Sequence, residues 1–225
     1  MTTYPILLEQ IEDRWIGHLV DVPGCFSNGP NPPAAAAAVP AALQEYVRWR
    51  SEREPGFTAV EGQAETLEQI PARHVGDDEI NAFFEADRAP LTKVDVKQYT
   101  QLLQWSRQSL LRSTLGLHDS HMRLPLRGER WPIYGVLEHV ANAENWYLER
   151  LGHAGATDSL PEEAFARLKT VRAQFFEIIS QLAGDDRVVE RDGELWSARK
   201  LLRRALWHER DHTAHIRKMR AQLDD

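Results

Sequence analysis

Hydrophobic and polar residues follow two different periods along this chain, and the change falls near Thr92. Before it, Tyr4–Ile11 and Trp15–Val20 are rich in aliphatic and aromatic residues, and turn residues separate them, as is typical of short strands. Ala34–Trp49 instead has the spacing of an amphipathic helix. We therefore expect two or three short antiparallel strands followed by a helix at the start of the chain.

From Thr92 onward the apolar positions recur with helical spacing. The pattern predicts four long helices, with glycine or proline in the connections, over residues 92–115, 132–152, 160–183 and 196–221. Four helices of comparable length with short connections are typical of an antiparallel bundle. The predicted fold class is therefore α+β, with a small α/β domain at residues 1–55, a connector at 56–91 that adds a strand at Phe57–Val60, and a four-helix bundle at 92–225.

Composition narrows the classes of partner. Acidic residues outnumber basic ones by 34 to 27, and the resulting net charge of −7 argues against nucleic acid as a partner. A chain with one cysteine, Cys25, forms no intrachain disulfide. The N-terminus lacks the pattern of a secretory signal, and no apolar run approaches the roughly 18 residues of a membrane helix. We expect a cytoplasmic protein with no membrane partner.

Histidines occupy the inward seam of the last predicted helix. Positions that alternate by four and three residues carry Leu201, Ala205, His208, His212, His215 and Met219. Burying an imidazole without a partner costs about 1–3 kcal/mol, so three of them on one seam require compensation. Hydrogen bonds within the core are one explanation, and a metal ion is another.

The spacing of three histidines favours the metal ion. His208 and His212 stand four residues apart and therefore share one helix face, while His139 is the one imidazole on the apolar stripe of the second helix. Three nitrogen ligands with an open position are typical of a catalytic site, and neutral imidazoles suit Zn²⁺ or Ni²⁺. His215 leaves an alternative open, because Asp211 and His215 are also four residues apart and could supply the pair.

The segment from His208 to His212 also matches H-E-x-x-H, the zinc-protease signature. Only thirteen residues follow it, without the downstream ligand that such proteases carry. In a bundle, Glu209 would instead orient an imidazole or face solvent. The candidates for a catalytic group are Glu209 and Asp211, and Glu138 is a further candidate for orienting a ligand.

Two segments carry a resemblance to a known family: Pro132–Val140 on the second helix and Trp207–Ile216 on the fourth. Together they resemble the DinB/YfiT-like family of metal-binding four-helix bundles. The resemblance implies a divalent ion held by His139, His208 and His212. It also implies activities such as thiol-dependent S-transfer, in which the metal acts with a low-molecular-weight thiol such as bacillithiol or mycothiol.

The first part of the chain is similar to HicB-like antitoxin domains, on the segments Tyr4–Glu9 and Gly17–Cys25. That similarity implies a partial ribonuclease-H-like α/β fold that binds another protein. No helix-turn-helix follows, so DNA regulation is not implied. We expect Cys25 to pack beneath the helix and His18 to lie on the surface.

Two functions follow from these observations. The first is a divalent-metal-dependent enzyme, a thiol-dependent S-transferase or a hydrolase, that acts on small electrophiles. Its anionic thiol could be received by the basic residues of the last helix, which otherwise form a solvated face: Arg199, Lys200, Arg203, Arg204 and Arg210. The alternative is a non-catalytic, metal-stabilised module for stress response or protein interaction. Aromatic residues expected on the outside of the bundle suggest a homodimer.

Overall fold

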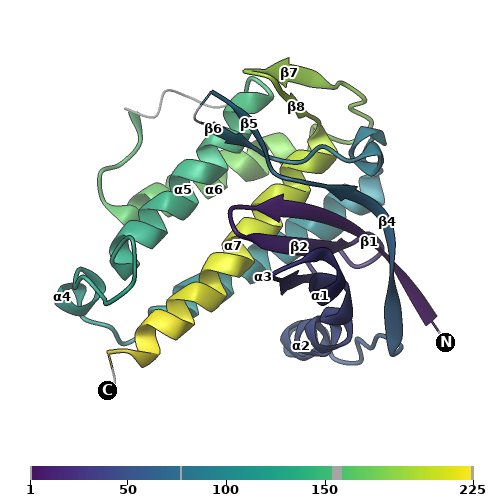
Figure 1. Ribbon diagram of the computed structural model, residues 1–225. Helices are drawn as coiled ribbons and strands as arrows, with labels where there is room; N and C mark the ends of the chain where they lie inside the picture. Colours follow the sequence, from purple (N-terminus) through teal and green to yellow (C-terminus); the bar gives the residue numbers. More distant parts are fainter. Residues whose placement is uncertain (1, 77, 154–158, 224–225) are drawn as a thin grey trace. The chain divides into compact units, whose positions relative to one another are not determined.

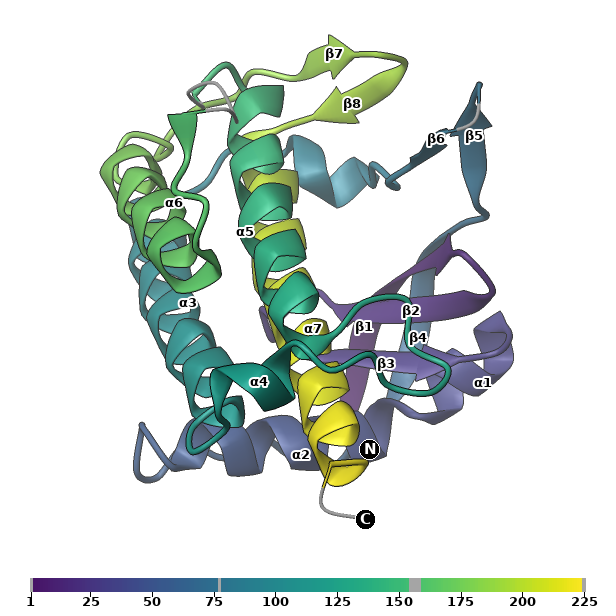
Figure 2. The ribbon, with the colours of Figure 1, turned by 90° about the vertical axis from the view of Figure 1, so that its left-hand side faces the viewer.

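The structure, a computed structural model, describes residues 2–76, 78–153 and 159–223. The chain divides into two compact units (Figures 1 and 2). One comprises the residues up to Arg88 together with Glu190–Leu195, and the other comprises Ala89–Val189 and the residues from Trp196 onward. Each unit is described separately below.

The first unit is built on a four-stranded sheet of mixed direction. Its strands are β1 (Thr2–Ile11), β2 (Arg14–Leu19), β3 (Phe26–Gly29) and β4 (Gly62–Ile70), in the order β3-β2-β1-β4. β2 pairs antiparallel with both β1 and β3, whereas β4 runs parallel to β1. The antiparallel strands confirm the pattern in the sequence.

Two helices pack on this sheet, α1 (Pro32–Ala37) and α2 (Val39–Ser51). The sequence predicted one helix here, but Pro40 cannot donate a backbone hydrogen bond, and a second helix begins at Val39 with Ala38 as its N-cap. Gly29 allows the close approach of α1 to β3, since a side chain there would collide with the backbone of Ala35.

The stretch expected to be a connector, residues 56–91, supplies secondary structure to the first unit instead. It contains β4, the antiparallel hairpin β5 (Arg73–Val75) and β6 (Asp78–Ile80), and the short 3-10 helix η1 (Glu85–Arg88). The strand expected at Phe57–Val60 lies outside the observed strands. β4 escaped prediction because its sequence, GQAETLEQI, is mostly polar and exposed, as an edge strand can be.

His18 corrects another expectation. Its side chain is buried rather than on the surface, and its Nε2 lies 2.6 Å from Oε1 of the equally buried Glu9 on β1. The second oxygen of Glu9 accepts a hydrogen bond from the backbone N–H of Ala82. The segment around Ala82 and Phe84 therefore covers this face of the sheet. The polar His18 and Glu9 gave no sign in the sequence that this face is buried.

In the second unit, the described residues contain four long helices that match the predicted ones to within a few residues. They are α3 (Lys93–Ser113), α5 (Ile133–Arg150), α6 (Ala164–Ile179) and α7 (Ala198–Ala221), and a single turn, α4 (Asp119–Met122), precedes α5. A capping box begins α3: Thr92 Oγ1 accepts from the Asp95 N–H and Asp95 Oδ2 accepts from the Thr92 N–H. Ser197 caps α7.

The bundle is not antiparallel throughout. α3 and α7 run parallel, as shown by the ion pair at 3.1 Å between Arg199 near the start of α7 and Asp95 near the start of α3. α5 and α6 also run parallel, since the first backbone N–H of α6, that of Ala164, donates to Tyr134 Oη at the start of α5. α5 and α7 are antiparallel neighbours. The antiparallel arrangement expected from the sequence is therefore wrong for these two pairs of helices.

A short hairpin, β7 (Val189–Arg191) and β8 (Glu194–Trp196), joins α6 to α7.

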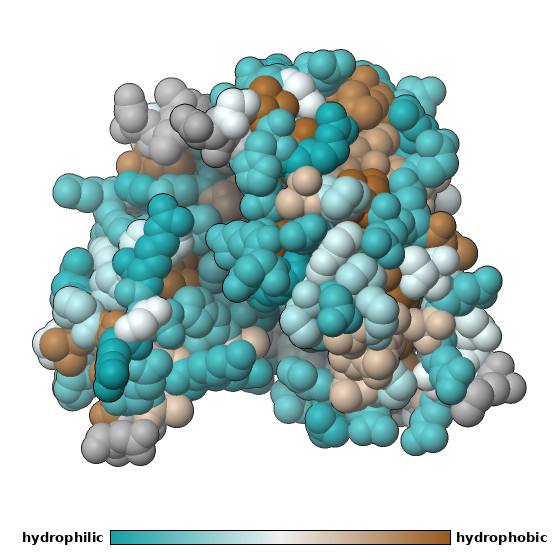
Figure 3. Space-filling model, viewed as in Figure 1, coloured by the Kyte–Doolittle hydropathy of each residue, from teal (hydrophilic) through white to brown (hydrophobic). Residues whose placement is uncertain are grey.

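On the face drawn in Figure 3, hydrophilic residues predominate and hydrophobic ones occur in small groups, as the charged composition leads one to expect. In the described part of the chain, no helix combines the length and the apolarity that crossing a bilayer requires.

Candidate metal centre

The seam predicted on the last helix exists, and α7 aims it at α5. Leu201 and Met219 are fully buried at its two ends, and His208 is 7% exposed between them. His212 follows one turn later, and His139 reaches the same place from α5. The fold therefore brings together the three histidines that the sequence singled out.

The three Nε2 atoms converge. His208 Nε2 lies 3.0 Å from His139 Nε2 and 3.1 Å from His212 Nε2. The rings are steeply inclined to one another, with centroids 4.4 to 5.0 Å apart. Three ring nitrogens thus face one small volume from three directions.

This arrangement fits a cation better than hydrogen bonds among the rings. An imidazole nitrogen either carries a proton and donates or carries a lone pair and accepts, so His208 Nε2 cannot donate to one neighbour and accept from the other. A cation accepts all three lone pairs at once. With metal–nitrogen bonds of about 2.0–2.1 Å, nitrogen ligands on one tetrahedral ion lie about 3.3 Å apart, close to the distances observed here.

Aromatic side chains pack against two of the three histidines. The indole of Trp131, from the loop that precedes α5, lies 4.9 Å from the His139 ring and is tilted 32° to it. Tyr147 makes an edge contact with His208 at 6.0 Å. Both contacts restrict the imidazole rotamers and thereby preorganise the site.

His215 has a different partner from the one considered in the sequence. Its Nε2 lies 2.6 Å from Glu129 Oε2, and the two side chains are 35% and 18% exposed. The His215 ring is 6.0 Å from that of His212, one turn away on α7. Glu129 belongs to the same loop as Trp131, so this loop places a carboxylate beside His215, the neighbour of His212 on α7. The sequence does not point to Glu129, because the loop has no periodic pattern.

Glu209 neither faces solvent nor is placed to orient an imidazole. Its two oxygens accept from Arg107 of α3 and from Arg172 of α6, and both guanidiniums also bind Glu144 of α5. These four buried side chains, one from each long helix of the described bundle, are called the buried quartet below. Burial alone would raise the pKa of the Glu209 carboxyl, but the charges of Arg107 and Arg172 outweigh burial and hold that pKa below its ordinary value.

The remaining acidic candidates and the two histidines near α4 differ in burial. Asp211 and Glu138 are partly buried, whereas His118 and His121 are exposed around α4. Cys25 is buried in the sheet unit, as expected.

The basic residues of α7 do not form one solvated face. Lys200 is fully buried, and its Nζ lies 4.3 Å from the Trp196 ring. Arg204 is also buried and lies over Trp207. The expected surface for an anionic thiol is therefore reduced to the partly exposed members of the set.

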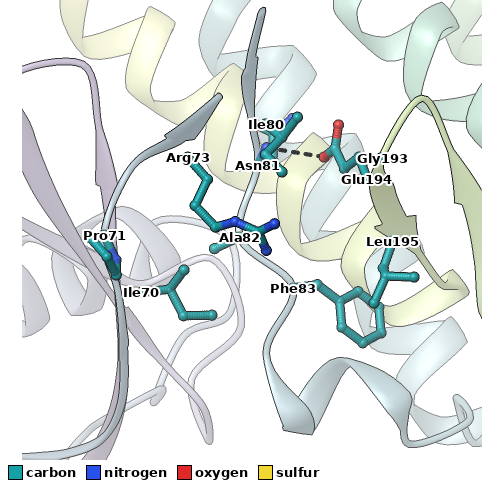
Figure 4. Close-up of a pocket in the computed structure, with 10 residues that line it drawn as sticks. All are labelled: Ile70, Pro71, Arg73, Ile80, Asn81, Ala82, Phe83, Gly193, Glu194 and Leu195. Carbon is teal, nitrogen blue, oxygen red and sulfur yellow. Dashed lines mark hydrogen bonds between the residues drawn. The ribbon is translucent and has the colours of Figure 1, made fainter. Parts of the chain in front are cut away.

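The first unit contains a small pocket, drawn in Figure 4. The backbone N–H of Asn81 donates to Glu194 Oε1 at its edge, and Arg73, Ile80 and Phe83 line it. Its volume is about 110 Å³. Pockets for small organic ligands typically measure about 300–1,000 Å³, so this one is too small for such a substrate.

Comparisons with known proteins agree with the bundle. The family model of the DinB superfamily matches residues 102–216, a span that includes all three histidines. Among solved structures, the chain is similar to YfiT from Bacillus subtilis, described as a probable metal-dependent hydrolase with an unusual four-helix bundle topology. The likeness covers 64% of this chain and 94% of that chain, with 17% sequence identity and a TM-score of 0.50, and at that identity it concerns the fold alone.

No curated protein matches the chain. The family match begins at residue 102, so the resemblance of the first part to HicB-like domains stays a prediction.

Proposed function

Because the chain belongs to the DinB superfamily, we propose that it is a metal-dependent hydrolase of small electrophiles, with His139, His208 and His212 as the metal ligands. The observation that carries the proposal is the convergence of three Nε2 atoms between α5 and α7. The description of YfiT as a probable metal-dependent hydrolase supports the choice of reaction.

Zn²⁺ or Ni²⁺ suits this site, because the donor set consists of imidazole nitrogens and three such ligands leave a position open. When bound, such a cation supplies Lewis acidity, which makes water a competent nucleophile near neutral pH.

A residue of the chain must then accept the proton that the attacking water releases. We assign Glu129 as the proton acceptor, because its carboxylate binds His215, one turn from His212 on α7, and is partly open to solvent. His215 donates to Glu129 Oε2 and so holds the carboxylate in place. Glu209 is excluded from this role because both of its oxygens are bound by arginines.

The test begins with metal binding. Chain purified without an affinity tag should hold about one ion per site after incubation with Zn²⁺ or Ni²⁺. His212→Ala should weaken binding by more than the roughly 10–100-fold that loss of an outer partner costs. His118→Ala, which removes an exposed histidine near α4, is the matched control and should bind as the parent does.

The reaction is tested next, with p-nitrophenyl acetate as an activated ester. Metal-loaded parent should hydrolyse it, and Glu129→Gln should lower the rate about 10²- to 10⁴-fold while binding the same amount of metal. Transfer of a low-molecular-weight thiol to chlorodinitrobenzene, without ester hydrolysis, would instead support the thiol-dependent S-transferase considered from the sequence.

The alternative, a non-catalytic module that metal merely stabilises, receives its support from the first unit. Its strand order, with two helices and then a final strand parallel to β1, is an α/β arrangement of the kind the HicB resemblance implies. Stabilisation by metal without turnover of either probe would favour this module, in which the sheet unit binds another protein.

A further inference from the structure

The buried quartet has features that the proposed reaction does not use. Each arginine binds both glutamates: Arg107 reaches Glu144 at 2.7 Å and also binds Glu209, and Arg172 reaches them at 2.6 and 3.0 Å. Each guanidinium also donates to a backbone carbonyl of the helix that carries the other arginine, Arg107 to Leu168 and Arg172 to Leu103. The network is closed, and each carbonyl lies four residues before the opposite arginine.

This network follows an internal repeat in the chain. Arg107 and Glu144 are 37 positions apart, and so are Arg172 and Glu209. The same offset of 65 positions relates the two arginines and the two glutamates, and it relates the first residues of α5 and α7. It also relates two copies of Gly-Glu-x-Trp, at residues 128–131 and 193–196. The halves α3–α5 and α6–α7 therefore share this pattern, and their two Arg–Glu pairs meet in the buried quartet.

Added stability is a poor explanation for such a network. Two charges lose their hydration when they are buried, and well-packed apolar residues in their place often give equal or greater stability. Paired guanidinium and carboxylate groups are instead strongly directional, because both hydrogen bonds form only at one relative position. Position is therefore the property that this arrangement controls.

We propose that the buried quartet is a positioning device that fixes the axial register of α5 against α7 and thereby assembles the three-histidine site. Glu209 directly follows His208 on α7, and Glu144 lies five residues after His139 on α5. A slip of one residue would move a helix by about 1.5 Å. That is half of the 3.0 Å between His139 Nε2 and His208 Nε2, whereas a metal site tolerates only about 0.2 Å in its bond lengths.

The test separates register from stability, and it rests on the proposed function only in using metal affinity as one readout. All four members are replaced by apolar residues: Arg107→Met, Glu144→Leu, Arg172→Met and Glu209→Leu. We expect a cooperative urea transition near that of the parent together with Co²⁺ affinity that is lower by about 10–100-fold, the range seen when outer partners of a metal site are lost. Co²⁺ affinity equal to that of the parent in this folded variant would overturn the proposal.

A charge-conserving variant tests whether the buried quartet sets the register if the apolar variant does not fold. Arg107→Lys with Arg172→Lys keeps both positive charges but loses the paired geometry. Its Co²⁺ affinity should fall and its visible Co²⁺ spectrum should change; an unchanged affinity and spectrum contradict the proposal. Arg199→Met with Asp95→Asn, which removes the ion pair at the starts of α3 and α7, is the matched control and should retain both.

A metal-free readout keeps this proposal distinct from the proposed function. Spin labels at Glu149→Cys on α5 and Lys218→Cys on α7, both exposed in the parent, report the register in a Cys25→Ser background. The distance distribution between the labels should broaden or shift in the double-lysine variant, even if the parent binds no Co²⁺. An unchanged narrow distribution would show that the quartet does not set the register.

Discussion

Adjacent residues on α7 serve opposite purposes. His208 directs a ring nitrogen into the three-histidine site, whereas Glu209, the next residue, points to the centre of the bundle and binds two arginines. The helical turn of 100° per residue separates the two environments. A substitution at either position should therefore have a distinct signature.

Removing one charge from the quartet should destabilise the protein strongly. Glu144→Gln leaves two buried arginines with one carboxylate, and breaking a buried pair in this way costs about 3–5 kcal/mol. Urea unfolding checks this expectation. Glu149→Gln, an exposed position on the same helix, is the control and should change stability by less than about 0.5 kcal/mol.

Metal affinity should depend on pH through the ligands. An imidazole must be neutral to bind a metal, and its ordinary pKa is about 6.5, so affinity should weaken progressively below that pH. Competition titrations with a chelator over a series of pH values measure this. Affinity that stays constant down to about pH 4.5 would argue against histidine ligands.

Among the elements, α3 shows how a local signal fixes a boundary. Thr92 and Asp95 satisfy each other's backbone N–H groups, and Arg199 of α7 binds the same carboxylate. Burial alone would raise the pKa of Asp95, but the hydrogen bonds from Thr92 and the charge of Arg199 lower it below its ordinary value. The carboxylate form is thus the one that the folded helix prefers.

The sign of the pH effect follows from that direction. Because the folded-state pKa of Asp95 is lowered, its contribution to stability is complete above the ordinary carboxyl pKa of about 3.9 and is lost as the pH falls through the lowered value. Asp95→Asn should therefore destabilise the protein near pH 7 and have little effect near pH 2. Paired unfolding curves at the two pH values test this, and an equal loss at both would assign the effect to hydrogen bonding alone.

The same local signals explain which elements could be predicted. Caps and apolar periodicity lie within the sequence of each helix, so the four long helices agree with their predicted ranges. Parallel neighbours in the bundle are set by contacts between distant segments, which periodicity does not contain. Periodicity does not mark Arg107 and Arg172 as buried either, because a charged side chain in a helix usually faces water. Only the repeated offset between Arg–Glu pairs could have revealed them.

For the molecule as a whole, two units with separate cores imply that metal acts on one of them. The three histidines all lie in the unit that contains α5 and α7. A ligand that binds only the folded state stabilises it by about 4 kcal/mol at a thousandfold excess over its Kd. That stabilisation should appear where the ligand binds.

Hydrogen exchange should localise the effect. With Zn²⁺ present, amides in α5 and α7 should exchange more slowly, while those of β1 and β2 in the sheet unit should not change. Mass spectrometry of the exchanged peptides resolves the two groups. Equal protection of both would place the ion, or its consequences, outside the three-histidine site.

The three histidines do not follow the internal repeat of the bundle. The offset of 65 positions pairs His139 with Arg204, His208 with Ala143 and His212 with Tyr147, so none of the three histidines is repeated in the other half of the bundle. Of the two sets of positions that the offset relates, only one carries histidines. Histidines installed at Arg204, Ala143 and Tyr147 would therefore test whether the repeat can carry a second three-histidine site.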